Sequence, residues 1–375
     1  MSSVYLDHAA TTPCDPQVVA AMRPFFHDSF GNTLSPHAFG RQSRKAVEDA
    51  REIIASFLGA QPQEIIFTSS ATEANNQVVR SLRSKGRHLV ISAIEHHCVL
   101  EPARRLTQEG YEVTLVAPDK DGIVQASSVE AAVRPDTVLI AVAHANNEIG
   151  VIQPVADIGR VARAKGVYFL VDAAQTVGHI PVNAGDMHCD FLSFSGHKFY
   201  GPQGVGALYM RKGVDCAPLL LGGDHERNRR AGTLNVPGIV GMGEAARLCR
   251  QQMSGEIPVQ TGLREGIIEG VLKAITGAAL NGHRTQRLPN NAHFSFEGVL
   301  GEDLVAALDM SGIACSVGSA CTSGQLTPSH VLKAIGLSDT QALGALRVTV
   351  GRWTKPQDIE YFLEQLKLKV KQLRG

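Results

Sequence analysis

A lysine in a short glycine-rich segment is the side chain of this sequence best suited to covalent chemistry. Lys198 follows Ser195-Gly196-His197, and Gly201-Pro202 comes after two aromatic residues. A lysine amine that is shielded from water loses its proton more readily and can then attack a carbonyl group. An ordinary surface lysine in a loop is the alternative, and this motif by itself does not decide between the two.

An aspartate at the end of an apolar run favours the reactive interpretation of Lys198. Asp172 closes Tyr168-Phe169-Leu170-Val171, which is typical of a buried β-strand. A buried carboxylate is costly unless it is paired, and a protonated pyridine nitrogen is a natural counter-charge. A pyridoxal cofactor binds a lysine and needs an acid beside its ring nitrogen, so it would satisfy both residues. A helix cap or a structural ion pair would also explain Asp172 taken alone.

Two further polar clusters have both a ligand-binding and a structural interpretation. Residues 68–73 (Thr-Ser-Ser-Ala-Thr-Glu) run from a strand into a helix start. Free N–H groups there bind phosphate, but Ser and Thr also act as ordinary caps. His96 would stack on an aromatic ring or would simply end a strand. The adjacent His97 and Cys98 suggest a metal, but neighbouring side chains of a strand point to opposite faces, so we expect no metal site.

A second candidate nucleophile lies far along the chain. Cys321 stands in Gly318-Ser-Ala-Cys-Thr-Ser-Gly324, a composition typical of an exposed loop. An accessible thiol can act as a nucleophile, whereas a buried one is inert. Cys315 follows an apolar run and is expected to be buried. For a cysteine considered alone, the unreactive interpretation is favoured.

The elements that must position these side chains alternate along the chain. Short apolar runs predict β-strands at 64–68, 88–92, 137–142 and 168–172. Helical patterns occur at 43–58, 72–84, 98–109 and 155–165. Such an order is typical of a mostly parallel sheet covered on both faces. Ligands bind at the carboxyl ends of such strands, so we expect the polar clusters to converge there.

After about residue 255 the pattern changes to that of a smaller lobe. A helix is predicted at 261–275, then strands and helices alternate to residue 373. We expect an α/β chain with a large domain of residues 15–255. A smaller α+β domain would comprise residues 1–14 and 256–375 and would carry Cys321.

Composition indicates the compartment in which the protein works and excludes some classes of partner. Lys+Arg and Asp+Glu both number 36 in 375 residues, so no net charge attracts nucleic acid or an anionic membrane. The N-terminus lacks the pattern of a signal peptide, and no run reaches the ~18 apolar residues of a membrane span. The seven cysteines are scattered and never spaced as Cys-x-x-Cys, which indicates a reducing compartment. We expect a cytoplasmic protein without nucleic-acid or membrane partners.

Together these motifs resemble the cysteine desulfurases of the class V aminotransferase family, which supply sulfur for iron–sulfur clusters and related products. The likeness runs from Tyr5 almost to the C-terminus. The segments that carry it are residues 5–13, 72–76, 95–96, 146–150, 172–175, 193–202 and 318–323. The stretch between Cys321 and Arg347 is similar to the long-loop branch of the family. The resemblance implies the aminotransferase-like fold of pyridoxal-phosphate enzymes, known as fold type I.

The resemblance also implies roles in binding pyridoxal 5'-phosphate. Lys198 would hold the cofactor as a Schiff base and move protons on the substrate. His96 would stack on the ring, Asp172 would pair with the ring nitrogen, and Gln175 with the phenolic oxygen. Further cofactor-binding residues would be Asn146 and, for the phosphate, Ala71 (through its amide), Thr72, Ser195, His197 and Thr233, the last from the partner subunit of a homodimer.

The substrate implied by the resemblance is L-cysteine. Asn32, Asn146 and Arg347 would orient it, with Arg347 as a bidentate clamp for its carboxylate. L-Alanine would be released, and the sulfur would pass to Cys321 as a persulfide. An acceptor protein, either a scaffold or a carrier, would then take the sulfur for iron–sulfur clusters or for another sulfur-containing cofactor or tRNA.

Two other functions remain open at this point. A small amino-acid transaminase or a selenocysteine lyase would use Lys198 and Asp172 equally well, because fold and cofactor do not define the reaction. Cys321 in its Gly/Ser-rich segment favours desulfuration, since a transaminase has no use for such a thiol. A non-catalytic scaffold or sulfur carrier on the same fold is the other alternative, and the intact set of Lys198, Asp172, Gln175, His96 and Cys321 argues against it.

Overall fold

A seven-stranded sheet forms the centre of the computed structural model, which describes residues 3–81, 86–318 and 327–375. The spatial order of the strands is β2-β8-β7-β6-β5-β3-β4. Their bounds are β2 Ile65–Thr68, β3 His88–Ser92, β4 Glu112–Val116, β5 Thr137–Ala143, β6 Tyr168–Asp172, β7 Phe191–Ser195 and β8 Gly206–Met210. Strands β4, β3, β5, β6 and β7 pair in parallel, whereas β8 is antiparallel to both of its neighbours. The expected mostly parallel sheet is confirmed.

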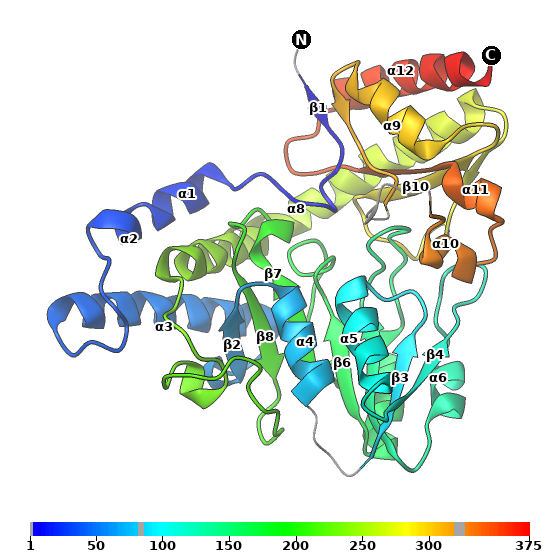
Figure 1. Cartoon of the computed structure of the whole chain (residues 1–375). Coiled ribbons are helices and arrows are strands. Elements are labelled where there is room, and N and C mark those ends of the chain that lie inside the picture. Colours follow the sequence, from blue (N-terminus) through cyan, green and yellow to red (C-terminus); the bar gives the residue numbers. More distant parts are fainter. Residues whose placement is uncertain (1–2, 82–85, 319–326) are drawn as a thin grey trace.

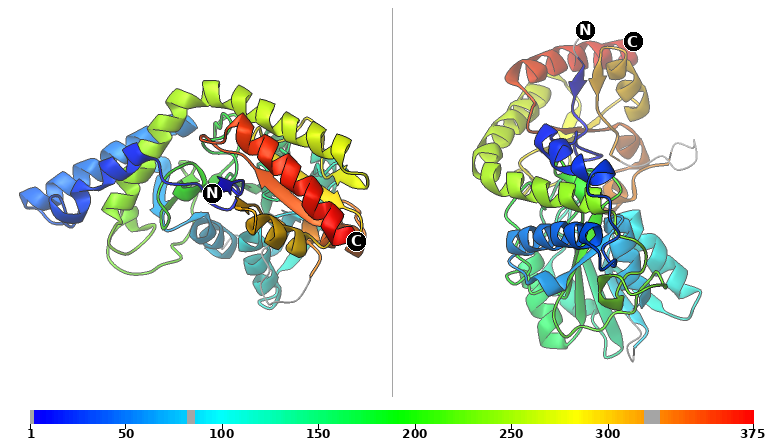
Figure 2. Two further views of the ribbon diagram at one scale, coloured as in Figure 1. Left: turned by 90° about the horizontal axis from the view of Figure 1, so that it is seen from above. Right: turned by 90° about the vertical axis from the view of Figure 1, so that its left-hand side faces the viewer.

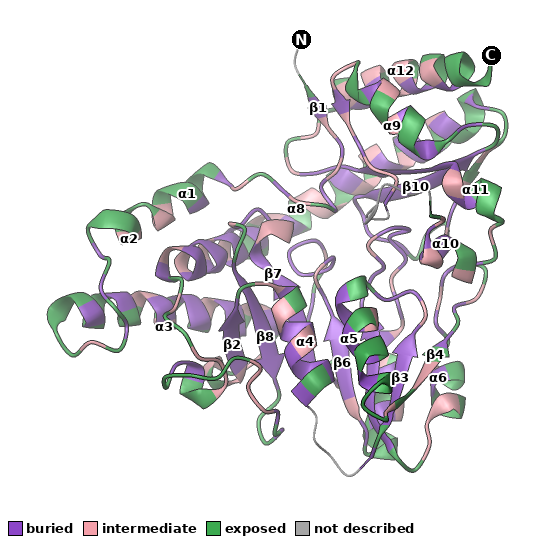
Figure 3. Ribbon diagram, in the orientation of Figure 1, coloured by how far each residue is buried: buried purple, intermediate pink, exposed green. Residues whose placement is uncertain are grey.

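Helices cover both faces of this sheet, as Figure 1 shows. They are α3 Ala38–Leu58, α4 Ala71–Ser81, α5 His97–Thr107, α6 Ala126–Ala132, α7 Val155–Lys165 and α8 Val236–Ala274. Side chains alternate along each strand, so Phe169 and Val171 pack with α3, α7 and α8, whereas Leu170 packs with α4 and α5. Figure 3 shows the result, a sheet that is buried almost throughout.

A smaller α+β unit lies beside the sheet. Strands β9 Ala278–Leu280, β10 Asn291–Phe296 and β12 Ala345–Thr349 form an antiparallel sheet in the order β12-β10-β9. Strand β1 Val4–Tyr5 pairs in parallel with β11 Ile313–Ala314, which joins the N-terminus to this unit. The C-terminus lies at the same end of the molecule (Figures 1 and 2). The helices of this unit are α9 Gly301–Asp309, α10 His330–Ala334, α11 Asp339–Leu343 and α12 Pro356–Arg374.

The 39-residue helix α8 joins the two units. Its first half contributes Ile239 to the core of the large sheet, and its second half contributes Ile267 to the core of the smaller unit. The predicted boundary between residues 255 and 256 falls inside this helix, and the division into two domains stays a prediction. The predicted α/β class with a smaller α+β part is confirmed.

Two short helices extend from the N-terminal strand. They are α1 Pro16–Met22 and α2 Pro24–His27, and with the start of α3 they project from the body of the molecule (Figure 1). The described residues also form three single-turn 3-10 helices, at Pro62–Glu64, Gly196–Lys198 and Glu226–Asn228. In the described part of the chain, no helix combines the length and apolar character that crossing a membrane requires.

Candidate active site

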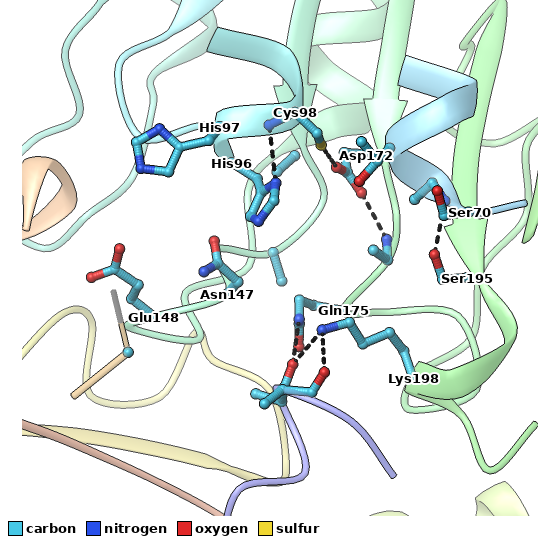
Figure 4. Close-up of a pocket in the computed structure, with 18 of the residues that line it drawn as sticks. Ser70, His96, His97, Cys98, Asn147, Glu148, Asp172, Gln175, Ser195 and Lys198 are labelled. Carbon is cyan, nitrogen blue, oxygen red and sulfur yellow. Dashed lines mark hydrogen bonds between the residues drawn. The ribbon is translucent and has the colours of Figure 1, made fainter. Parts of the chain in front are cut away.

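A cavity of about 390 Å³ opens where the strands of the large sheet end, between that sheet and the smaller unit. Figure 4 shows its labelled residues, which come from the ends of the strands and from the starts of α4 and α5. Most predicted site residues line it, namely Ala71, Thr72, His96, Asp172, Gln175, Ser195, His197, Lys198 and Arg347. The fold therefore brings residues that are up to 276 positions apart to one place, from Ala71 to Arg347.

Lys198 lies at the end of the short turn that follows β7. Its Nζ donates hydrogen bonds to the backbone oxygens of Ala9 (2.6 Å) and Ala10 (2.8 Å). Burial lowers the pKa of Lys198 to about 8, and the nearby positive charge of Arg347 acts in the same direction. The amine therefore loses its proton far more readily than that of an exposed lysine, which suits it to attack on a carbonyl carbon.

The Asp172 carboxylate is buried at the end of β6 and is fully engaged by hydrogen bonds. Its Oδ2 accepts from Asn75 Nδ2 (2.7 Å) and from the thiol of Cys98 (3.7 Å), and its Oδ1 accepts from the Ala174 amide (2.9 Å). Asn75 is oriented in turn by the Ser193 hydroxyl, which donates to its Oδ1 (2.6 Å). Donors on both oxygens hold the carboxylate in one orientation.

Sequence reasoning gave no role to Asn75 or Cys98. Asn75 lies one turn into α4, the helix whose start lines the cavity, and it is fully buried. It belongs to the segment 72–76 that carries the family resemblance, and this was the signal that could have marked it. Burial raises the pKa of Cys98 well above that of a free thiol. The Cys98 thiol therefore stays protonated and acts as a hydrogen-bond donor rather than as a nucleophile.

The opposite end of the cavity combines a helix start with small polar side chains. The Ala71 amide, the first of α4, donates to Ser195 Oγ (2.8 Å). His197 Nδ1 lies 3.1 Å from Thr11 Oγ1, and burial lowers the pKa of His197 to about 4, so its ring is neutral at physiological pH. A hydroxyl, a neutral imidazole and the positive end of a helix dipole suit an anionic group such as a phosphate.

His96 caps the start of α5. Its Nδ1 accepts a hydrogen bond from the Cys98 amide (3.1 Å), which leaves the proton of the neutral ring on Nε2. Desolvation lowers the pKa of His96, although the charge of Asp172 opposes this. Hydrogen bonding by the backbone therefore orients a neutral imidazole at the cavity.

Arg347 comes from β12 of the smaller unit and is almost completely buried. Its guanidinium donates to the Asn147 carbonyl (2.7 Å) and pairs with Asp7 (2.8 Å). Its Nε, also buried, has no partner among the described residues. Arg347 thus lines the cavity as a fixed cation, and such a guanidinium can bind a carboxylate.

Asn146 does not line the cavity, whereas its neighbour Asn147 does. The Asn146 side chain instead orders the loop after β5, since its Oδ1 accepts from the amides of Glu148 and Ile149 and its Nδ2 donates to the Ile94 carbonyl. A direct contact of Asn146 with a ligand stays a prediction. The family resemblance implied a binding role for it, but a buried asparagine also satisfies turn amides.

The remaining predicted site residues lie away from this cavity or outside the described residues. Asn32 and Thr233 are both exposed and do not line it. Cys321 falls within residues 319–326, outside the described part of the chain. Ser316 and Gly318, which precede that segment, do line the cavity, as does His330 after it.

The fold and this site define the class of protein. The family model described as aminotransferase class V matches residues 4–362. The chain belongs to this family, which confirms the resemblance seen in the sequence.

Individual relatives are similar over almost the whole chain. A protein named cysteine desulfurase IscS from Dictyoglomus turgidum is 48% identical over 375 residues, covering 99% of this chain and 95% of the relative. One of the same name from Methanosarcina thermophila is 45% identical, covering 100% and 93%. A solved NifS-like protein has a TM-score of 0.92 at 36% identity, with 98% of each chain covered. A structure described as SspA in complex with cysteine has a TM-score of 0.82 at 36% identity, covering 93% of this chain and 99% of that one.

Proposed function

We propose that this protein is a pyridoxal-phosphate-dependent cysteine desulfurase that converts L-cysteine to L-alanine and receives the sulfur on Cys321. The observation that carries the proposal is the convergence of Lys198, Asp172 and Arg347 on one cavity, in a chain 48% identical to a cysteine desulfurase. The cytoplasm is the proposed location, because the scattered cysteines suit a reducing compartment.

The groups lining the cavity fit pyridoxal 5'-phosphate. Lys198 would hold its aldehyde carbon, and the buried Asp172 carboxylate would pair with its ring nitrogen. Gln175 and His96 would contact the ring. Its phosphate would lie at the start of α4, with Ala71, Thr72, Ser195 and His197. When bound, the cofactor would supply an electron sink for negative charge at the substrate Cα.

The side chains of this chain would bind the substrate and move its protons. Arg347 would hold the α-carboxylate, which directs the amino group and Cα of cysteine toward Lys198. The Lys198 amine, whose pKa is about 8 in the cofactor-free chain, would take the Cα proton and return it during turnover. The walls of the cavity limit water around these groups, which strengthens their electrostatic interactions.

The sulfur would leave by attack of the Cys321 thiolate on the sulfur atom of the substrate. A new S–S bond forms as the Cβ–S bond breaks, and the electron pair of that bond stays with the carbon skeleton. Protonation of the skeleton yields L-alanine, and the sulfur remains as a persulfide on Cys321. An acceptor protein, a scaffold or a carrier, would then take the sulfur for iron–sulfur clusters or for another sulfur-containing cofactor or tRNA.

A homodimer is part of the proposal. Thr233 is exposed and lies outside the cavity, so a second chain is the natural place for it to meet the phosphate. The projecting arm formed by α1, α2 and the start of α3 also carries exposed large apolar side chains, which are Val19, Phe26, Phe30, Leu34 and Phe39. Apolar surface gathered on one arm is typical of an association site.

Product analysis of the purified protein tests the proposal. Equal amounts of L-alanine and sulfide from L-cysteine plus a reductant are expected, from a protein with the absorbance band of lysine-bound cofactor. Cys321→Ala should keep that band and lose sulfide release, whereas Cys14→Ala, which removes a half-buried thiol outside the cavity, should retain activity. Full activity of Cys321→Ala would contradict the role of this cysteine. A coloured wild-type protein that forms neither product would favour a transaminase or a lyase for another substrate.

A further inference from the structure

Glu148 is a cavity residue to which neither the sequence nor the proposed mechanism gives a role. It lies in the loop after β5, and Figure 4 shows it beside Asn147 on the side of the cavity away from Asp172. The loop itself is well ordered by hydrogen bonds, because Asn146 accepts from its amides and Asn291 Nδ2 donates to the Glu148 carbonyl (3.1 Å). Glu148 is thus a buried carboxyl group on a fixed backbone.

The carboxyl group contacts the residue that precedes α10. Ser329 Oγ donates to Glu148 Oε2 at 2.5 Å. The same Oγ accepts hydrogen bonds from the amides of Val331 (3.1 Å) and Leu332 (3.3 Å), where it caps the helix. A serine hydroxyl has one proton and two lone pairs. Because both lone pairs accept from helix amides, the hydroxyl donates its proton to Glu148. Ser329 is three residues beyond the segment 319–326 that contains Cys321.

The other side of that segment also meets Glu148. Gly318 has a φ of +91°, and a Cβ placed on it would lie 3.5 Å from both Cβ and Cγ of Glu148. The Gly318 amide donates to Ser316 Oγ (3.0 Å), and the Ser316 backbone pairs with that of Arg347. Glu148 is thus hydrogen-bonded to Ser329, after residues 319–326, and is a near neighbour of Gly318, before them.

The same loop holds the predicted substrate clamp. Arg347 donates to the carbonyl of Asn147, the neighbour of Glu148, at 2.7 Å. The positive charge of Arg347 also acts on the Glu148 carboxyl group, where it opposes the effect of burial, which raises the pKa of Glu148. Ser329 and Arg347 are thus both hydrogen-bonded to the loop after β5.

We propose that Glu148 is a positioning residue for sulfur transfer, which fixes Ser329 and the start of α10 to the loop that holds Arg347. This inference rests on the proposed function, since it concerns the transfer of sulfur to Cys321. Glu148 acts through Ser329 and makes no bond to the reacting atoms. Its loss therefore affects the transfer rate more than the binding of cofactor or substrate, because misplacing a reactive group slows a reaction without weakening distant contacts.

Single-turnover sulfur transfer in the cofactor-loaded protein tests this. Persulfide on Cys321 is measured by acid quenching, thiol alkylation and protein mass after mixing with L-cysteine. Ser329→Ala and Glu148→Ala should slow its formation on the order of tenfold. The affinity for L-alanine, read from its effect on the cofactor spectrum, should stay within about twofold of wild type. Glu148→Gln, whose amide oxygen still accepts from Ser329, should be close to wild type.

A matched control separates positioning from helix capping. Ser338 caps α11 as Ser329 caps α10, with its Oγ accepting from the Gln341 amide (3.3 Å), but it is exposed and does not line the cavity. Ser338→Ala should transfer sulfur at the wild-type rate. Wild-type rates in both Ser329→Ala and Glu148→Ala would overturn the inference, as would a Glu148→Gln variant as slow as Glu148→Ala. Loss of cofactor binding in Ser329→Ala and Glu148→Ala alike would also overturn it, because it would mark a purely structural role.

Measurements on the wild-type protein distinguish a failure of this inference from a failure of the proposed function. Wild-type protein that forms alanine and persulfide, with variants that do so equally fast, would overturn the role of Glu148 alone. Wild-type protein that forms neither product would overturn the proposed function and this inference together.

Discussion

At the scale of single residues, the site works by placing ionisable groups where water cannot stabilise their usual charge. Lys198 and His197 are both affected in this way, since burial lowers the pKa of each. Asp172 is the opposite case, a carboxylate kept in place by donors from Asn75, Cys98 and Ala174. The result is a reactive amine beside a fixed negative charge, as a pyridine aldehyde would require.

Lys198 leads to a prediction about pH. The neutral amine is the reactive form, and it becomes the major form as pH rises through the Lys198 pKa of about 8. The rate at which cofactor-free protein binds pyridoxal 5'-phosphate should rise between about pH 7 and about pH 9 and then level off. Stopped-flow absorbance measures this rate, and Lys198→Arg serves as the blank. Arg347→Gln removes a neighbouring positive charge, so its rise should occur at higher pH. A wild-type rate that still climbs steeply above pH 9 would contradict the lowered pKa.

At the scale of elements, a buried ion pair secures the segment between β8 and α8. Arg51 of α3 donates to both carboxylate oxygens of Glu226 (2.7 and 2.9 Å), and Glu226 also accepts from the Phe67 amide of β2. Glu226, Arg227 and Asn228 all have positive φ, a conformation that costs free energy in residues other than glycine. The ion pair therefore holds a strained turn, and the same segment carries Thr233.

Removing this pair should destabilise the fold. Glu226→Gln leaves the buried Arg51 cation with only the partly exposed Glu48 as a counter-charge, so we expect the free energy of unfolding to fall by about 3 kcal/mol. Glu48→Gln is the matched control, because Glu48 also contacts Arg51 but its side chain is 46% exposed, and its loss should cost less than about 1 kcal/mol. Urea unfolding of the cofactor-free variants measures both. Equal losses in the two variants would contradict a special role for the buried pair.

At the scale of the whole molecule, the exposed apolar arm predicts how two chains associate. Phe26 and Phe30 are 67% and 66% exposed, and the Phe30 ring packs at 5.6 Å on that of Phe39. A double substitution, Phe26→Asp with Phe30→Asp, would place two charges in the proposed interface, so we expect a monomer. Because Thr233 would then lack its partner site, affinity for the cofactor should also fall by about tenfold.

Light scattering coupled to size-exclusion chromatography, with a cofactor titration, checks both expectations. Met310→Asp is a suitable control, since Met310 is 88% exposed but lies after α9 in the smaller unit. It should leave the molar mass of the assembly unchanged. A dimeric double variant would place the interface elsewhere on the molecule.

Local patterns in the sequence predicted most of the central sheet. Apolar runs located β2, β3, β5 and β6 to within a residue, because a strand buried on both faces must be apolar along its whole length. The strand β4 was not predicted, since the polar residues Glu112 and Thr114 leave no continuous apolar run along its five residues. The strands around the lysine motif, β7 and β8, were not predicted either.

The sequence by itself determined the chemistry of the site, because Lys198, Asp172 and Arg347 have side chains whose charge and reactivity belong to the residue. Only the tertiary structure decided which neighbours modify that chemistry. The donors Asn75 and Cys98 reach Asp172 from α4 and α5, and Glu148 meets Ser329 across 181 positions of the chain. Tertiary structure likewise places Asn147 rather than Asn146 on the cavity. Such contacts depend on how elements pack, and packing sums many small forces from residues that are distant in sequence.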